Sequence, residues 1–296
     1  MSADRLVEVA PGRRLFVREY GSGAPVLLLH GFTGCGESME RAAAACPPDT
    51  RRIFVDLLGH GRSDAPQDAD VWSMERCASD LVAVLDALEV PAATVLGYSM
   101  GARIALGLAL WRPERVARLV LVGARAGIAD PEVRAARVRD DERLARRIEG
   151  EGIEAFVDHW MALPVFASQA RLGEEALRAA RAQRLRNRPE ALARSLRGMG
   201  VGAQPSLHDA LPGVRAPTLL VTGAEDTRFG EAARELASLL PNARHVVLPE
   251  AGHAAHLENP RAFAQALRAF ASDFPLPSAG EPTMSVDWKR DRKSVV

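Results

Sequence analysis

The sequence has few cysteines and no excess of charge of either sign. Among 296 residues there are three cysteines, and 38 lysines and arginines balance 38 aspartates and glutamates. Cys35, Cys46 and Cys77 are odd in number and lack metal-ligand spacing, which argues against a metal site and favours a reduced, cytoplasmic protein. Cys35 lies near a candidate active-site loop, but no partner motif accompanies it. A net charge of zero argues against nucleic acid or an anionic membrane as the main partner.

Long apolar runs and a signal segment are also missing. The longest apolar run, near residues 116–122, suits a buried strand and is far shorter than the roughly 20 residues of a membrane-spanning helix. Asp4, Arg5 and Glu8 interrupt the first residues, so we expect no secretory signal. There are no internal repeats, and we expect a soluble protein.

Residues 94–102 organise the rest of the chain. A short apolar run at 92–96 meets the motif Gly-Tyr-Ser-Met-Gly at 97–101, and a helix-forming stretch follows from residue 102. G-x-S-x-G between a strand and a helix is typical of a nucleophile elbow, where a sharp turn raises the serine above the sheet. Because motif matches also arise by chance, a glycine-rich loop remains the alternative at this point.

Strands and helices alternate on both sides of this elbow. Apolar runs near residues 26–29, 53–56, 118–122, 218–221 and 245–248 predict strands of a mostly parallel, doubly wound α/β sheet. Residues 128–209 show no clear strand, are rich in Ala, Arg, Leu and Glu, and predict an inserted helical cap. We therefore divide the chain into a core at 1–127 and 210–274, a cap at 128–209 and a flexible tail at 275–296.

A histidine and an acid follow Ser99 at later predicted strand ends. Asp226 comes after the run 218–221, and His253 lies in a loop after the run 245–248. A base that takes the serine proton and a carboxylate that orients the base make Ser99, His253 and Asp226 a candidate triad. Separately, Asp226 can cap the next helix and His253 can be a plain loop residue. Glu225 and His256 compete with them for the two roles, and we expect His256 to be structural.

The loop after the strand 26–29 reads His-Gly-Phe-Thr-Gly at residues 30–34. We expect the backbone N–H groups of Phe32 and Met100 to form an oxyanion hole beside Ser99, because such holes use one donor after the nucleophile and one from this loop. His30 is expected to tie loops together and not to act in catalysis.

These motifs together resemble the α/β-hydrolase superfamily over roughly residues 26–271. Besides the elbow and the triad, the likeness includes Gly-His-Gly-Arg-Ser at 59–63. Fold alone does not name a substrate. Finer features, among them residues 134–139, 160–168, 183–187 and 202–205, resemble the 2-succinyl-6-hydroxy-2,4-cyclohexadiene-1-carboxylate synthases of menaquinone biosynthesis.

The resemblance implies a lyase that removes pyruvate from an enolpyruvyl cyclohexene with a succinyl ketone. It implies substrate contacts by the side chains of Tyr98, Arg103, Arg137, Trp160 and Arg184. Arg103 also stands one helical turn after Ser99, where a guanidinium exposed to the cavity suits a carboxylate and contributes little to folding. The expected partner is a small polycarboxylate, with no cofactor, no metal and no stated oligomeric state.

Two other functions stay open from the sequence. One is a carboxylesterase or carbon–carbon bond hydrolase in which Ser99 attacks a carbonyl. The other is a binding protein without catalysis, against which the intact Ser99, Asp226 and His253 argue. In the lyase, we expect the serine alkoxide to act as a base, with the oxyanion hole holding an enolate.

Overall fold

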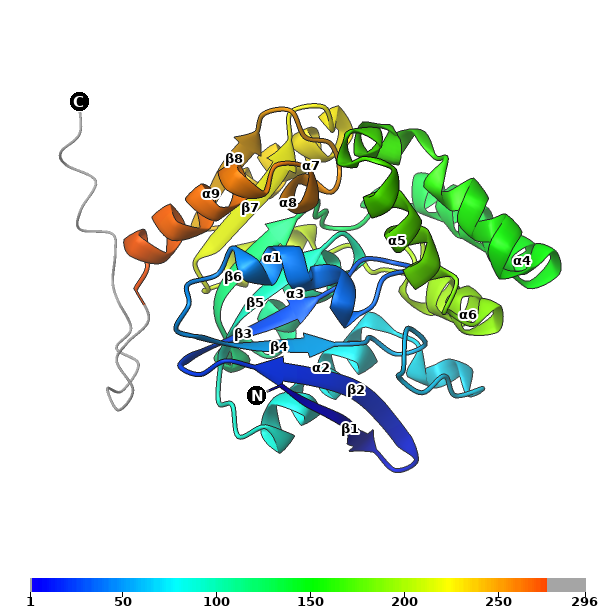
Figure 1. Ribbon diagram of the computed structural model, residues 1–296, viewed down its shortest axis with the longest axis horizontal. Helices are drawn as coiled ribbons and strands as arrows, with labels where there is room; N and C mark the ends of the chain where they lie inside the picture. The colour runs from blue at the N-terminus through cyan, green and yellow to red at the C-terminus, as the bar shows by residue number, and fades with distance from the viewer. Residues whose placement is uncertain (1, 276–296) are drawn as a thin grey trace.

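An eight-stranded sheet runs through the computed structural model, which describes residues 2–275 (Figure 1). The strand order is β1-β2-β4-β3-β5-β6-β7-β8; β1 pairs antiparallel with β2, β2 pairs antiparallel with β4, and the remaining pairs are parallel. The strands are β1 (Ala3–Ala10), β2 (Arg13–Tyr20), β3 (Ala24–Leu29), β4 (Thr50–Val55), β5 (Ala93–Tyr98), β6 (Val116–Val122), β7 (Thr218–Gly223) and β8 (Ala243–Leu248). The predicted α/β fold is confirmed. Apart from Pro275, the predicted tail lies outside the described residues.

Helices cover both faces of the sheet because alternate strand residues point to opposite sides. The core helices are α1 (Glu40–Ala44), α2 (Met74–Ala87), α3 (Met100–Trp111), α7 (Thr227–Leu239), α8 (Ala255–Glu258) and α9 (Pro260–Asp273). Leu27 and Leu29 pack in one apolar cluster with α2, α3 and α7, and Val26 and Leu28 pack in another with α1 and α9. Short 3₁₀ turns are η1 (Gly36–Met39), η2 (Ala69–Val71), η3 (Pro113–Arg115) and η5 (His208–Gly213).

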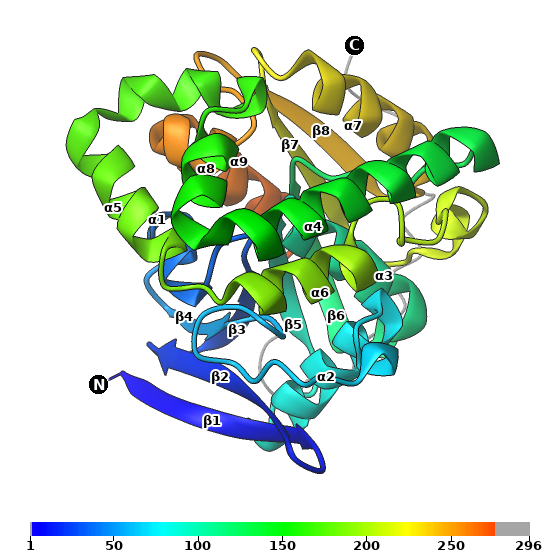
Figure 2. The ribbon, with the colours of Figure 1, turned by 90° about the vertical axis from the view of Figure 1, so that its right-hand side faces the viewer.

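The segment between β6 and β7 contains the predicted cap. It forms α4 (Pro131–Met161), η4 (Pro164–Leu172), α5 (Glu174–Arg184) and α6 (Pro189–Met199). Three of these elements, α4, η4 and α6, begin at a proline. Proline suits the first helical turn because its missing N–H has no helical partner there. In Figure 2, α4 and α6 lie in front of the strand ends. The cap limits at 128 and 209 stay a prediction.

Two local features shape this cap. Gly152 interrupts α4 with φ 79° and ψ 174°, so that two helical stretches meet there at a bend. Ala145 and Ile148 before the bend, and Phe156 after it, share a small apolar cluster with Leu192 of α6. The two ends of the segment meet, because the backbone N–H of Leu207 donates to the carbonyl of Ala126 at 2.8 Å.

No helix among residues 2–275 combines the length and the apolar character that crossing a membrane requires.

Candidate active site

Ser99 occupies a sharp turn between β5 and α3. Its φ is +51°, a left-handed conformation that side chains other than glycine seldom adopt. A Cβ at Gly97 would lie 2.4 Å from the carbonyl oxygen of Gly101, and one at Gly101 would lie 2.2 Å from that of Leu29. Both flanking positions therefore need glycine, which gives the G-x-S-x-G pattern a steric reason.

The side chains of Ser99, His253 and Asp226 form one hydrogen-bonded chain. His253 Nε2 lies 3.0 Å from Ser99 Oγ, and His253 Nδ1 lies 2.8 Å from Asp226 Oδ2. A carboxylate only accepts, so the imidazole proton stands on Nδ1 and leaves Nε2 free to take the serine proton. His253 and Asp226 are both buried. The arrangement is that of a general base with an orienting carboxylate.

Asp226 fulfils both interpretations that its sequence position allowed. While Oδ2 accepts from His253, Oδ1 accepts from the backbone N–H of Phe229 at 3.2 Å and caps α7. The competing Glu225 is exposed and pairs with Arg171 instead. His256 is buried against the Tyr98 ring, with neither ring nitrogen bonded to any described residue.

His30 ties two loops together. Its Nε2 accepts from the backbone N–H of Leu57 at 3.0 Å, and its Nδ1 lies 2.8 Å from the carbonyl of Gly31. Burial lowers the pKa of His30 to about 4. The ring is therefore neutral at pH 7, and its two nitrogen atoms contact the two loops.

Glu258, to which the sequence analysis gave no role, holds the loop that carries His253. Its Oε2 accepts from the backbone N–H of Gly252 at 2.8 Å, and its Oε1 accepts from that of Ala254 at 3.1 Å. Both neighbours of the histidine are thus fixed by one buried carboxylate. In the sequence, the role of Glu258 is marked only by an acid five residues after the histidine. That spacing predicts no contact unless the conformation of the loop is known.

The expected oxyanion-hole donors lie beside the serine. Met100 is the first residue of α3, where helix N–H groups lack intrahelical partners, and Phe32 follows Gly31. A Cβ at Gly31 would lie 3.5 Å from the Cβ of Ser99, so the loop comes close to the nucleophile. Within residues 2–275, neither the Phe32 nor the Met100 N–H donates to a loop carbonyl or a side chain. Asn187 of the cap donates to the carbonyl of Thr33 at 2.8 Å and so steadies this loop.

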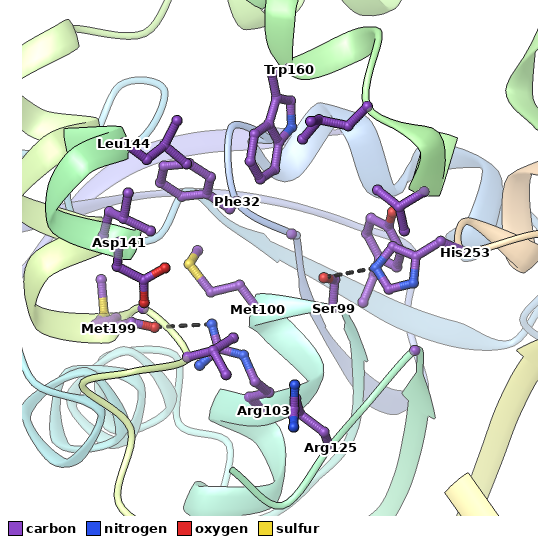
Figure 3. Close-up of a pocket in the computed structure, with 18 of the residues that line it drawn as sticks. Phe32, Ser99, Met100, Arg103, Arg125, Asp141, Leu144, Trp160, Met199 and His253 are labelled. Atoms are coloured by element: carbon purple, nitrogen blue, oxygen red, sulfur yellow. Dashed lines mark hydrogen bonds between the residues drawn. The ribbon is translucent and has the colours of Figure 1, made fainter. Parts of the chain in front are cut away.

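A cavity of about 390 Å³ lies over Ser99, between the strand ends and the cap (Figure 3). Its apolar wall includes Phe32, Leu144, Trp160, Phe166 and Met199. Two acids line it, Asp140 and Asp141. Five arginines line it, Arg103, Arg125, Arg137, Arg184 and Arg228. Below we call this cavity the pocket.

Arg103 lines the pocket, as expected, but the protein itself also binds its guanidinium, so the expectation that it contributes little to folding is not met. Arg103 is only 7% exposed; it donates to Gln204 Oε1 at 2.9 Å and to the carbonyl of Met199 at 2.9 Å (Figure 3). Burial, with the nearby charge of Arg137, lowers its pKa to about 10, so it remains charged at pH 7. Arg103 therefore joins α3 to the last residue of α6 and to the loop that follows it, as well as facing the pocket.

The other four predicted substrate contacts also line the pocket. Arg137 donates to Asp141 Oδ1 at 2.7 Å, and Arg184 donates to the carbonyl of Ala180 at 2.9 Å. The Nε atom of Arg184 and the indole N–H of Trp160 are buried without a partner among the described residues. The ring of Tyr98 lies 5.3 Å from that of His253. The structure thus brings these residues around Ser99; their contacts with substrate stay a prediction.

The sequence alone assigns no role to Arg125 and Arg228. Arg125 follows β6, and Arg228 is near the start of α7. No local pattern marks these two residues, because the arginine-rich chain offers many equivalent candidates. Gln204 belongs to the segment 202–205 that carries the resemblance, but its contact with Arg103, across 101 positions of sequence, could not be read from it. No group of three or more metal-binding side chains occurs in the part of the chain that the structure describes.

The parallel sheet, the serine elbow and the connected triad define the α/β-hydrolase class. A family model described as the alpha/beta hydrolase fold matches residues 24–260. A protein of Bacillus subtilis (strain 168), provisionally named 2-succinyl-6-hydroxy-2,4-cyclohexadiene-1-carboxylate synthase, is 40% identical over 266 residues, covering 89% of this chain and 97% of the relative. The chain belongs, within the α/β-hydrolases, to the family of these synthases.

Solved structures share the backbone closely. The structure of MenH from S. aureus has a TM-score of 0.82 and 29% identity, covering 87% of this chain and 98% of that one. A malate-bound thermophilic esterase from Thermogutta terrifontis has a TM-score of 0.79 and 28% identity, covering 93% and 99%. Backbone likeness alone therefore does not separate a lyase from an esterase.

Proposed function

We propose that this protein is a lyase of menaquinone biosynthesis. It converts 2-succinyl-5-enolpyruvyl-6-hydroxy-3-cyclohexene-1-carboxylate to 2-succinyl-6-hydroxy-2,4-cyclohexadiene-1-carboxylate and pyruvate. The observation that carries the proposal is a Ser–His–Asp chain beneath a pocket lined by five arginines and two aspartates. An uncharged ester would gain nothing from such a lining, whereas a substrate with three carboxylates is matched by it.

The reaction balances without a cofactor. Ser99 Oγ, whose proton passes to His253 Nε2, removes the proton from the ring carbon that bears the succinyl ketone. The electron pair enters the ring, the existing double bond shifts, and the carbon–oxygen bond to enolpyruvate breaks. The abstracted proton returns to the leaving group, which becomes pyruvate. No water is consumed, and no electron is gained or lost.

Electrostatics lower the barrier to proton removal. The carbon–hydrogen bond next to a ketone is weakly acidic, and charge builds on the ketone oxygen as the proton leaves. The N–H groups of Phe32 and Met100 would stabilise that enolate oxygen, a type of contact that commonly contributes about 3–4 kcal/mol to the transition state. Asp226 would stabilise the transient imidazolium of His253.

Carboxylate recognition falls to the arginines. In this proposal Arg103, Arg137 and Arg184 bind carboxylates of the substrate, while Tyr98 and Trp160 contact its ring. The substrate is thus a small anion.

The proposed location is the cytoplasm. Cys35, Cys46 and Cys77 are buried free thiols, which suits a reducing compartment.

The alternative is an esterase or carbon–carbon bond hydrolase, in which the same Ser99 forms an acyl-enzyme. Three measurements separate the functions. The enolpyruvyl substrate, made enzymatically from isochorismate, should release one pyruvate per turnover, while p-nitrophenyl acetate should be hydrolysed weakly and without a burst. Mass spectrometry of protein quenched during turnover should find unmodified Ser99. A covalent adduct that forms and decays at the turnover rate contradicts the base role.

The triad variants Ser99→Ala, His253→Ala and Asp226→Asn should each reduce pyruvate release strongly. Because the three residues act as one unit, the double variants should lose little more than the single ones. Stopped assays of pyruvate in each variant measure this. Independent, multiplicative losses would show that the residues do not work as a relay.

A further inference from the structure

Arg125 is a half-buried arginine of the pocket, and residues 2–275 offer its guanidinium no hydrogen-bond partner. It belongs to the loop that follows β6, and in Figure 3 it stands beside Arg103 below Ser99. Its Nε is buried with no hydrogen-bond partner, and no hydrogen bond or ion pair joins its guanidinium to any residue in 2–275. A buried charged donor that makes no hydrogen bond costs free energy of folding, so the position of this side chain needs an explanation.

The loop of Arg125 is also fixed close to the catalytic histidine. Gly123 has φ +63°, and a Cβ there would lie 2.7 Å from His253 Cε1. The Gly123 N–H donates to the carbonyl of Val221 at 3.1 Å, which anchors the loop to β7. A group bound by Arg125 would therefore lie on the same side of the pocket as the triad.

Most of the charge around Arg125 is of its own sign. Burial lowers its pKa, the guanidinium groups of Arg228 and Arg137 lower it further, and the carboxylate of Glu235 raises it. Glu235 lies 3.2 Å from His208 and forms no ion pair with Arg125. The pocket acid Asp141 is committed to Arg137 and to the backbone N–H of Gly202, at 2.7 and 2.9 Å. The other pocket acid, Asp140, pairs with Arg143. No acid of the pocket is left to neutralise this arginine.

We propose that Arg125, with Arg228 at the rim, forms a separate carboxylate subsite and makes Arg125 a specificity-determining residue. The inference rests on the proposed function and deepens it, since it assigns one of the substrate carboxylates to this subsite. A planar carboxylate can take two parallel N–H bonds from the guanidinium and remove the repulsion with Arg228. Both the enolpyruvyl carboxylate and a carboxylate that the product retains have this chemistry.

Kinetics of matched charge deletions test the subsite. Arg125→Met should lower kcat/KM for pyruvate release by about ten- to a hundredfold, mainly through KM. Arg125→Lys should recover part of the loss, because it keeps the charge but not the fork. Arg268→Met is the control, since Arg268 is exposed on α9, away from the pocket, and loses the same charge. Equal kcat/KM in Arg125→Met and Arg268→Met would overturn the proposal.

Ligand-induced shifts of Tm give a readout that needs no turnover. Without ligand, Arg125→Met should melt no lower than the wild type, because the substitution removes an unpaired charge; a lower Tm would indicate a structural role. Pyruvate or succinate should raise the Tm of the wild type and not that of Arg125→Met. Loss of the pyruvate effect assigns the leaving group, and loss of the succinate effect assigns a retained carboxylate.

The two proposals fail separately. If the wild type releases no pyruvate, the lyase proposal falls, while an Arg125-dependent Tm shift still supports an anion subsite. If neither acid changes the Tm of the wild type, the kinetic comparison alone decides. Equal stabilisation of wild type and Arg125→Met by both acids overturns the subsite.

Discussion

At the scale of single residues, Arg103 shows that a pocket-lining charge can also hold the fold together. Its guanidinium is the donor for two buried acceptors, Gln204 Oε1 and the carbonyl of Met199. A buried acceptor that loses its donor costs about 1–3 kcal/mol, whereas a solvated one costs almost nothing. The side chain therefore contributes to stability as well as to substrate recognition.

We expect Arg103→Ala to lower the free energy of unfolding by about 1–3 kcal/mol and also to reduce kcat/KM. Urea unfolding followed by circular dichroism measures the first effect, and pyruvate release measures the second. Arg134→Ala is the control, because Arg134 is exposed on α4. Unchanged unfolding free energy in Arg103→Ala would show that its two hydrogen bonds do not stabilise the fold.

Glu258 is the residue that positions the catalytic histidine through its loop. Glu258→Ala would leave the N–H groups of Gly252 and Ala254 without acceptors, so kcat should fall about tenfold or more while KM changes little. Glu258→Gln keeps one carbonyl oxygen and should lose less. Steady-state kinetics of both variants test the order. A rise in KM with unchanged kcat would assign Glu258 to substrate binding instead.

At the scale of elements, the bend in α4 sets the shape of the pocket. Arg137, Asp141 and Leu144 reach the pocket from before Gly152, and Trp160 reaches it from after the bend. A straight helix of the same length could not bring both groups to one cavity. The bend depends on a conformation that only glycine adopts without strain.

Gly150 provides a matched comparison for Gly152. A Cβ would meet nothing within 4 Å at either position, but only Gly152 has positive φ, at 79°. Gly152→Ala should therefore destabilise the protein by about 1–2 kcal/mol, whereas Gly150→Ala should stabilise it by about 0.5–1 kcal/mol. Thermal unfolding of the two variants gives the comparison. Equal shifts in Tm would mean that the backbone at 152 is not constrained.

At the scale of the whole molecule, the sequence predicted the sheet and the order of the triad. Apolar runs marked the buried strands, and the G-x-S-x-G motif marked Ser99 because its glycines have a local steric cause. Asp226 and His253 followed from their places at strand ends. Such features are local in sequence, or follow from the parallel topology that makes strand ends converge.

The features that the sequence did not reveal are set by contacts between distant segments. Arg103 meets Met199 across 96 positions, and the buried state of its guanidinium depends on that meeting. Among the described residues, Arg125 lacks an ion-pair partner because the acids of the pocket form ion pairs with other arginines. The bend at Gly152 cannot be distinguished in sequence from the harmless Gly150. Each of these requires the packed cap.

Acid should destabilise the whole molecule through three buried histidines. Burial lowers the pKa from 6.5 to about 4 for His30 and to about 3 for His60 and His256. Between pH 4 and 6.5 the unfolded chain therefore binds more protons than the native one, and stability falls as pH falls. Each histidine should contribute a loss of about 2 kcal/mol between pH 7 and pH 5.

Urea unfolding at pH 5, 6 and 7 measures this loss. His256→Phe should flatten the pH dependence by about the contribution of one histidine, because His256 lies between the rings of Tyr98 and Phe263. Equal pH dependence in this variant and the wild type would show that His256 does not titrate on unfolding.

The hydrogen bond between Leu207 and Ala126 places the entrance and the exit of the helical insertion side by side. The insertion between them can therefore be exchanged as one segment, which we call the cassette, because joining residue 126 directly to residue 207 would leave the registers of β6 and β7 unchanged. The cassette contains Trp160, Arg137 and Arg184. The α/β core keeps the triad and Arg125. New substrates can thus be acquired by replacing a single contiguous coding segment. Arg125 would remain behind, and any newly acquired cassette would inherit its preference for an anion.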